Sequence, residues 1–481
     1  MPNSEHRRTL KACDPCKRRK VKCNGQARCQ QCTHAGLPCT YATSVSDQQR
    51  KKAVRRGTVI AECRTLMLKP PHTSSSLSPQ ALPVQIPQPI SSNQNPSFFL
   101  ELLSDYEQYV YPMSPVIPAD MVQDMITHMT DNTDAASYVY IFAAVTLSLA
   151  RSEPVQDATA TRDQIAMLLT RSLELRRPFG LDSQPTVVHV MRDVFTEMSC
   201  MTLRRPELGH MYLREAISLL YMLNAHSEDD LARLDVPQRA RLQRAYWECF
   251  IHERFTALTY HRPTSLDPLS ALPDHDASLP ADVEVGFNYC IKNFCLIDRK
   301  FLDLWLGDRS GVTAGWVEEK QHQLEDIDWH CEVSRLPKMQ QADLIITRHW
   351  LRTLTWQMGL SNTLLSSSPG SSILLSLSFP LRLSNELRQF LITIPRDLVG
   401  IHGSGILKKL FEIASTIADV VLHMPYTPGD DTVQRIHDIL FLKKFVFSFA
   451  GLQSLWPELL SQKFEMIRDK YPEIKEMELL V

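Results

Sequence analysis

The sequence predicts a small N-terminal module held together by cysteines, then a basic connector, a disordered linker and a large all-α domain. Half of the 12 cysteines lie between positions 13 and 39. Residues 70–97 contain seven Pro, seven Ser and no Asp, Glu, Lys or Arg, a composition that cannot build a core. From Phe98 onward, apolar residues recur at the spacing of one helix face.

These changes in composition divide the chain into four parts. We expect a cysteine module over residues 1–41, a basic connector over 42–69, a Pro/Ser-rich disordered linker over 70–97 and an all-helical domain over 98–481. Because Gly57 interrupts the apolar residues of the connector, a sustained coiled coil is not expected there. A short helix from about 58 to 68 is the alternative for this segment.

Several windows of the last part follow the helical period. In segment 101–111 one face carries Leu102, Leu103, Tyr106, Tyr109 and Val110. Segments 162–177 and 206–223 follow the same pattern, and the second begins with Pro206, which suits the first helical position. Segment 236–260 predicts a long helix that stops at His261-Arg262-Pro263. We expect loops at 263–285, 306–314 and 366–372.

Charge is distributed unevenly along the chain. Residues 1–69 carry 16 Lys and Arg against 4 Asp and Glu, a balance of +12, and the remainder carries 36 against 50, a balance of −14. A basic segment on an acidic body suggests a polyanionic partner, most often nucleic acid. The sequence shows neither an N-terminal signal peptide nor a run of 18 apolar residues, so we expect a protein of the reducing interior with no membrane span.

The cysteine cluster consists of two segments, Cys13–Cys23 and Cys29–Cys39, that share the spacing C-x2-C-x6-C. Structural zinc takes four ligands in a tetrahedron, and thiolates suit it. One four-thiolate site would leave two cysteines unused, whereas two zinc ions that share two thiolates would use all six. The repeat favours two structural zinc ions bridged by Cys13 and Cys29, and the expected ligands are Cys13, Cys16, Cys23, Cys29, Cys32 and Cys39.

So small a module has almost no apolar core, so metal binding must supply its folding free energy, typically ~10–16 kcal/mol per structural zinc. A disulfide framework is the alternative, but a dense cysteine cluster in a reducing compartment favours metal. We interpret His34 as a surface residue, because the cysteines already saturate the site.

The spacing C-x2-C-x6-C-x5-C-x2-C-x6-C, with CDPCKRRKVKC at its start, resembles the fungal-type Zn(II)2Cys6 binuclear-cluster transcription factors. The resemblance implies a DNA-reading helix after the second cysteine, with Lys20 at the position that touches base edges and Arg19 beside it. Lys17, Arg18 and Lys22 would then bind phosphates. Family members usually carry proline two places before the fourth cysteine, whereas this chain has Ala27.

One such cluster reads about three base pairs, which is too few for a genome. The family's solution is often a dimer on two CGG-like half-sites of double-stranded DNA, so a homodimer is an open alternative here. Nuclear import could use the same basic residues or segment 50–56. That segment could equally contact DNA or be a solvated linker.

Segment 245–267 is similar to the fungal transcription factor middle homology region. Trp247, Phe250, Glu253, Arg254 and His261-Arg262-Pro263 stand at its typical positions, although His261 replaces the usual glycine. Segment 378–390 also resembles this family. We expect the aromatic residues to be core and Glu253 and Arg254 to make structural contacts. A small-molecule effector of this domain is an open alternative, and tail 471–481 has the mixed acidic and apolar composition of an activation segment.

No P-loop, G-x-S-x-G or H-E-x-x-H motif occurs, so we expect no enzyme and no catalytic residues. The resemblance implies a nuclear, sequence-specific regulator of RNA polymerase II genes that contacts the transcription machinery. Its expected role is a pathway-specific activator of a biosynthetic gene cluster, in secondary metabolism. The alternatives are a regulator of carbon-source utilisation and, from another class, a zinc-scaffolded adaptor without specific DNA readout.

Overall fold

The computed structural model describes six positions of the N-terminal region and most of the remaining chain. These residues are 13, 23, 24, 26, 29, 30, 95–150, 158–362, 364–365, 372–423, 432–449 and 455–471. The chain divides into two compact units, Met1–Ile90 and Ser91–Val481. The connector 42–69 with its alternative helix, and nearly all of the expected linker, lie outside the described residues. A small metal-cluster module followed by a large helical domain is confirmed as the fold class.

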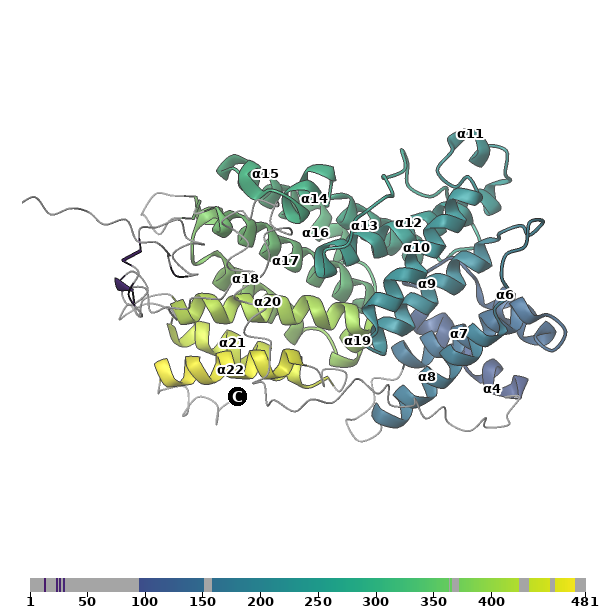
Figure 1. Ribbon diagram of the computed structural model, residues 1–481, viewed down its shortest axis with the longest axis horizontal. Coiled ribbons are helices and arrows are strands. Elements are labelled where there is room, and N and C mark those ends of the chain that lie inside the picture. The colour runs from purple at the N-terminus through teal and green to yellow at the C-terminus, as the bar shows by residue number, and fades with distance from the viewer. Residues whose placement is uncertain are drawn as a thin grey trace, which may run out of the picture. The chain divides into compact units, whose positions relative to one another are not determined.

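The second unit is helical, with no strand among its described residues. Its first half packs helices α7, α8, α9 and α10 against one another, with α12 beside α9 and α10 (Figure 1). The elements are α4 (Pro96–Glu101), α5 (Leu103–Asp105), the π-helix η2 (Tyr106–Val110), α6 (Ala119–His128), α7 (Thr133–Ala150), α8 (Ala158–Leu175), α9 (Val187–Thr202), α10 (Pro206–Met222), α11 (Glu228–Leu231) and α12 (Val236–Tyr260).

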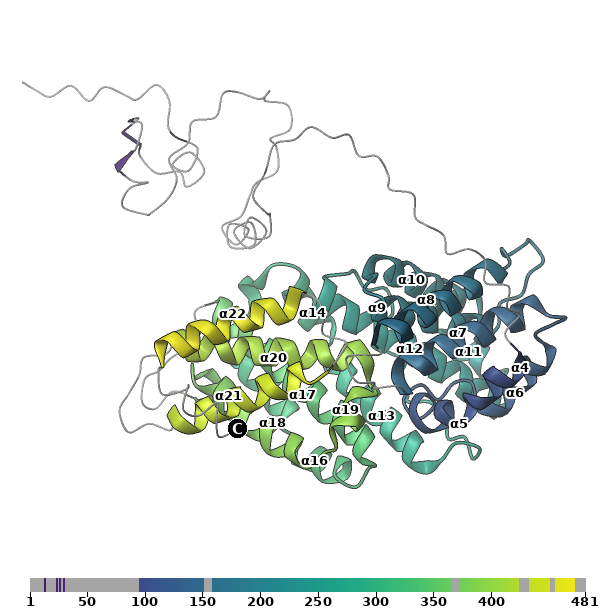
Figure 2. The same cartoon turned by 90° about the horizontal axis from the view of Figure 1, so that it is seen from below.

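The second half surrounds helix α20, which packs against α17, α18, α21 and α22 (Figure 2). Its elements are α13 (Ala281–Cys295), α14 (Arg299–Leu306), η3 (Arg309–Gly311), α15 (Ala314–Leu324), α16 (Ile327–Val333), α17 (Lys338–Ser361), η4 (Ile373–Leu375), α18 (Phe379–Ile392), α19 (Arg396–Gly400), α20 (Gly403–His423), α21 (Thr432–Phe447) and α22 (Leu455–Lys470). Because the main apolar core cluster contains residues from both halves, the second unit has one dominant hydrophobic core.

Helix α7 is the one helix among the described residues that is long and apolar enough to cross a membrane. Its 18 residues have a mean hydropathy of 1.3, and 78% of them are buried inside the protein. Helices α6, α8 and α9 cover it. Burial by neighbouring helices gives α7 the role of a core helix in the helical unit.

The helices begin and end close to the expected positions, with three informative differences. The first helix of the helical unit begins at Pro96 rather than Phe98, because Asn95 caps it and proline fits the first helical position. Segment 101–111 is partly a π-helix, in which the Tyr111 N–H donates to the Tyr106 carbonyl at 2.8 Å. The loop expected over 263–285 is shorter, because α13 begins at Ala281. Most of the loop expected at 366–372 and nearly all of the tail lie outside the described residues.

Candidate metal centre

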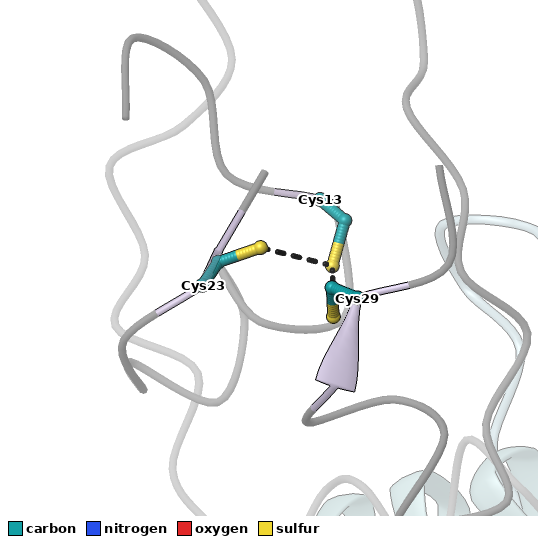
Figure 3. A group of neighbouring side chains, drawn as sticks. All are labelled: Cys13, Cys23 and Cys29. Carbon is teal, nitrogen blue, oxygen red and sulfur yellow. Dashed lines mark hydrogen bonds between the residues drawn. The ribbon is translucent and has the colours of Figure 1, made fainter. Parts of the chain in front are cut away.

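Three of the expected ligands come together although they are distant in sequence. The Sγ atoms of Cys13 and Cys29 lie 3.6 Å apart, and Cys23 Sγ lies 3.8 Å from Cys13 Sγ (Figure 3). All three side chains are buried, and their sulfur atoms lie within 4.8 Å of one another. Separations this long exclude disulfide bonds between these cysteines, since a disulfide joins its sulfur atoms at about 2.05 Å.

The sulfur geometry fits zinc. Thiolates bound to one zinc at about 2.3 Å lie about 3.8 Å apart when the coordination is tetrahedral. The separations of 3.6 and 3.8 Å match this edge length. Cys13 is close to both other cysteines, which is the position a bridging thiolate requires. Bound zinc would supply the cross-links that an apolar core provides in larger domains.

The other expected site residues lie outside the described part of the chain. This applies to Cys16, Cys32 and Cys39, and to Lys17, Arg18, Arg19, Lys20 and Lys22. Between Cys23 and Cys29, Asn24 Nδ2 donates to Gln26 Oε1 at 3.1 Å, and both side chains are exposed. Ala27, which replaces the usual proline, is also outside the described residues.

In the helical unit, Glu253 and Arg254 make the structural contacts that we expected. The buried Glu253 carboxylate accepts hydrogen bonds from the backbone N–H groups of Ser265 at 2.8 Å and Leu266 at 2.9 Å. Arg214 of α10 donates to the same carboxylate at 2.7 Å. Arg254 donates to the Leu266 carbonyl at 2.7 Å. Together these contacts attach the segment after α12 to the helix itself, and they give the Glu-Arg pair a structural role.

The departure from glycine at position 261 has a visible consequence. His261 ends α12 with φ 54° and ψ 43°, in the left-handed region where glycine is favoured. Its ring stacks on Trp305, with centroids 5.9 Å apart. The chain therefore holds His261 in a backbone conformation that is unfavourable for residues with a side chain, while the His261 ring packs on Trp305.

A further cluster of charged residues was not expected from the sequence. His252 of α12 lies with Nδ1 2.8 Å from Glu197 Oε2 of α9 and with Nε2 3.5 Å from Glu248 Oε1. The spacing of Glu248 and His252 on one helix face was a readable signal. The contact with Glu197 could not be predicted from the sequence, because Glu197 lies on another helix.

Comparison with known proteins agrees with the metal centre. The model of the fungal Zn(2)-Cys(6) binuclear cluster domain matches residues 11–48. The maltose fermentation regulatory protein MAL13 of Saccharomyces cerevisiae is 22% identical over 91% of this chain and 89% of its own length. The probable sucrose utilization protein SUC1 of Candida albicans is 22% identical over 89% of this chain and 82% of its own. The respiratory transcription factor ZNF1 of S. cerevisiae is 24% identical over 73% of this chain and 74% of its own length.

Together with these relatives, the thiol cluster and the matched domain indicate a DNA-binding transcription regulator built on a two-zinc module. The chain carries a fungal Zn(2)-Cys(6) binuclear cluster domain at residues 11–48, and along the helical unit it is similar to these relatives at 22–24% identity.

Proposed function

We propose that this protein is a nuclear regulator of genes for carbon-source utilisation. The supporting observation is that its likeness to the maltose regulator MAL13 and the sucrose utilization protein SUC1 extends beyond the cysteine module. Each alignment covers about nine-tenths of this chain, including the helical unit. A shared zinc module alone would say little about target genes, whereas similarity through the regulatory body favours a related regulatory task.

The names of the relatives favour a regulator of carbon-source utilisation over the expected activator of a biosynthetic gene cluster. Two of the three relatives are named for the use of a sugar, and the third is named for respiration. Control of a biosynthetic gene cluster remains the second prediction, and the positions of the target genes distinguish the two.

For the metal centre we propose six thiolate ligands: Cys13, Cys16, Cys23, Cys29, Cys32 and Cys39. Cys13 and Cys29 would bridge the two zinc ions, which the 3.6 Å separation of their sulfur atoms supports. The zinc ions are structural and carry out no reaction, because four protein ligands leave no open position for a substrate.

For DNA recognition we propose that Lys20, with Arg19 beside it, donates to guanine O6 and N7 in the major groove of CGG-like half-sites. A good contact of this kind contributes about 1–3 kcal/mol of discrimination. Lys17, Arg18 and Lys22 would bind phosphates, which adds affinity without base selectivity. A homodimer would extend the site beyond the few base pairs that one module reads.

The deciding experiment is a genome-wide binding map of the full chain in its host, compared with a Lys20→Ala variant. We expect occupied sites at promoters of sugar uptake and hydrolysis genes, centred on CGG-like half-sites. The variant should lose these sites. Sites concentrated over biosynthetic gene clusters would support the second prediction instead. Full occupancy by a chain that lacks residues 1–60 would show an adaptor recruited by other proteins.

A binding assay on purified protein separates base reading from phosphate binding. Lys20→Ala should retain zinc and lose its preference for CGG over altered half-sites. The matched variant Lys17→Ala should bind all sequences more weakly to a similar degree, with a smaller dependence on salt. Unchanged preference among half-sites in Lys20→Ala would remove the assignment of Lys20.

A further inference from the structure

A cavity of about 160 Å³ lies inside the helical unit, where α7, α9 and α12 face α13, α17 and the first turn of α20. Figure 1 shows α9 and α12 beside one end of α20, and α9 and α20 are in contact. Met113, Ser148, Thr202 and Ser404 at its edge are half-buried, so solvent reaches the cavity. The cavity therefore joins the two halves of the helical unit.

One wall of the cavity presents hydrogen-bond acceptors. Glu197 and Glu248 are both buried and both line it. Each contacts His252 through one carboxylate oxygen, at 2.8 Å for Glu197 and 3.5 Å for Glu248. A carboxylate has two oxygens and about four lone-pair sites, so each can accept further hydrogen bonds from a guest molecule.

Other residues that line the cavity present donors. The Lys409 ammonium donates to Asp343 at 3.1 Å and to Thr347 at 2.7 Å, and an ammonium carries three protons. The residues Gly403, Ser404 and Gly405 line the cavity as the first turn of α20, where backbone N–H groups have no partner within the helix. A Cβ atom on Gly403 would lie 2.9 Å from Leu149 Cδ2, and its φ is +64°. Glycine thus keeps the backbone of this turn close to the cavity.

The hydroxyl of Ser114 provides an independent indication of a ligand. Ser114 lines the cavity, is 2% exposed, and its Oγ has no hydrogen-bond partner in the structure. A buried hydroxyl without a partner costs about 1–3 kcal/mol. A guest that offers a hydroxyl group would satisfy it.

The side-chain charges around the cavity disfavour anionic guests. Burial would lower the pKa of His252, but the charges of Glu197 and Glu248 and the hydrogen bonds to them raise it to about 10, so the ring is cationic at neutral pH. Burial would raise the pKa of Asp343, but Lys409 holds it below its usual value. Three carboxylates thus face two cations, His252 and Lys409, and the excess negative charge repels an anion.

The size of the cavity sets the size of the guest. An enclosed cavity of about 150 Å³ accommodates one benzene ring. A single six-membered ring therefore fits, and because the cavity is open to solvent, the polar substituents of the ring can extend toward its edge. Apolar side chains, among them Phe255, Phe294 and Ile251, line the rest of the cavity and suit the faces of such a ring.

We propose that this cavity binds a small neutral polyhydroxylated ligand, one sugar ring in size, as an effector of the helical unit. Hydroxyl groups both donate and accept, so they match the acceptors, the donors and the unpartnered Ser114 around the cavity. The choice of a sugar over a zwitterion of similar size rests on the proposed function in carbon-source use.

The test is calorimetric titration of the purified full chain with D-glucose, maltose, glucose 6-phosphate and L-proline. We expect D-glucose to bind at one site per chain. Maltose should bind more weakly because its two rings exceed the cavity, and glucose 6-phosphate should be at least about tenfold weaker because of the carboxylates. Ser114→Ala should weaken sugar binding about 3- to 10-fold, the range of one hydrogen bond. The matched control is Ser384→Ala, which removes another buried hydroxyl without a partner, at a serine that does not line the cavity. It should leave binding unchanged.

Ser148→Phe, at the half-buried edge, provides a second variant that should block entry. Tighter binding of maltose, L-proline or glucose 6-phosphate than of D-glucose would overturn the proposal. The absence of D-glucose binding at 10 mM, about ten times a Kd of 1 mM, would overturn it too. Sugar affinity that is unchanged in both Ser114→Ala and Ser148→Phe would place the ligand elsewhere and overturn it too. Because the titration involves no DNA, its failure is separate from a failure of the target-gene assignment in the binding map.

Discussion

Glu253 holds Ser265 by both its backbone N–H, at 2.8 Å, and its hydroxyl, at 3.0 Å. The two residues belong to α12 and to the segment that follows its end. The same carboxylate binds Arg214 of α10, so one buried side chain joins two helices and a connecting segment. The chain direction after His261-Arg262-Pro263 therefore depends on a carboxylate one to two helical turns before the helix ends.

Replacing this carboxylate should be costly. Glu253→Gln keeps the shape of the side chain but removes its charge from beside Arg214 and Arg254. We expect a loss of about 3 kcal/mol in the free energy of unfolding, the lower end of the range for breaking a buried ion pair, because the amide oxygen retains one acceptor. Urea denaturation followed by circular dichroism measures this loss.

The matched control is Glu332→Gln in α16, where the carboxylate pairs with Arg335 at 2.6 Å but both side chains are exposed. That change should alter the free energy of unfolding by less than about 1 kcal/mol. Equal losses for Glu253→Gln and Glu332→Gln would contradict a structural role for the Glu253 contacts.

The left-handed backbone of His261 predicts which of two substitutions at this position gives the more stable protein. His261→Gly and His261→Ala both remove the ring that stacks on Trp305, so they differ only in the Cβ atom. The glycine variant should be more stable than the alanine variant by about 1 kcal/mol, since alanine is disfavoured at positive φ.

The same pair of substitutions at Glu319, which is exposed within α15, should give the opposite order. In the middle of a helix, glycine is about 1 kcal/mol less favourable than alanine. Thermal or urea unfolding of the four variants measures both differences in stability. The same order at both positions would show that His261 does not hold a left-handed conformation in solution.

His252 should make stability depend on pH. Its pKa in the folded protein, about 10, lies above the ordinary value of 6.5, because the charges and hydrogen bonds of Glu197 and Glu248 outweigh burial, which alone would lower it. Its stabilising contribution is therefore complete below about pH 6.5 and is lost as the pH rises through 10. The advantage of the unmodified protein over His252→Gln, measured by urea denaturation, should shrink from pH 7 to pH 10. A difference that stays constant over this range would contradict the charged pairing.

Removing zinc should unfold the cysteine module and leave the helical unit folded. A chelator, or the variant Cys13→Ser, should abolish specific DNA binding and unfold the module, because the metal supplies its folding free energy. The helical unit has its own core, so its circular dichroism and unfolding midpoint should change little. Zinc content should be about two per chain in the unmodified protein. Cys331→Ser, at an exposed cysteine of the helical unit, should keep both zinc ions. Loss of the helical signal on chelation would show that the two units do not fold independently.

Much of the architecture was predictable because its signals are local. The doubled cysteine spacing is sufficient to predict a two-zinc module, since tetrahedral coordination leaves few ways to use six thiolates. The helices followed from apolar periodicity, and Pro206 begins α10 as expected. The π-helix at Tyr106–Val110 and the early start of α13 were missed, because both depend on packing and capping rather than on periodicity.

Helix α12 shows where local reasoning ends. Arg244, Glu248, Glu253 and Arg254 are charged residues of the kind usually found on a solvated face, yet all four are buried. Their partners lie on other elements: Arg244 reaches Asp276 at 2.9 Å, and Glu253 reaches Arg214. The helical period predicts the helix but cannot reveal that neighbours cover it on several sides.

The cysteine spacing and the basic residues between the first three cysteines predicted a two-zinc module with a nucleic-acid partner, because metal coordination and charge depend on residues close together in the chain. The class of protein followed from the resemblance of this motif to a known family. The cavity was decided by the tertiary structure alone. Glu197, His252 and Lys409 come from three different helices. Only the packing of the unit determines which of these charges meet and leaves the buried Ser114 hydroxyl beside them without a partner among the described residues.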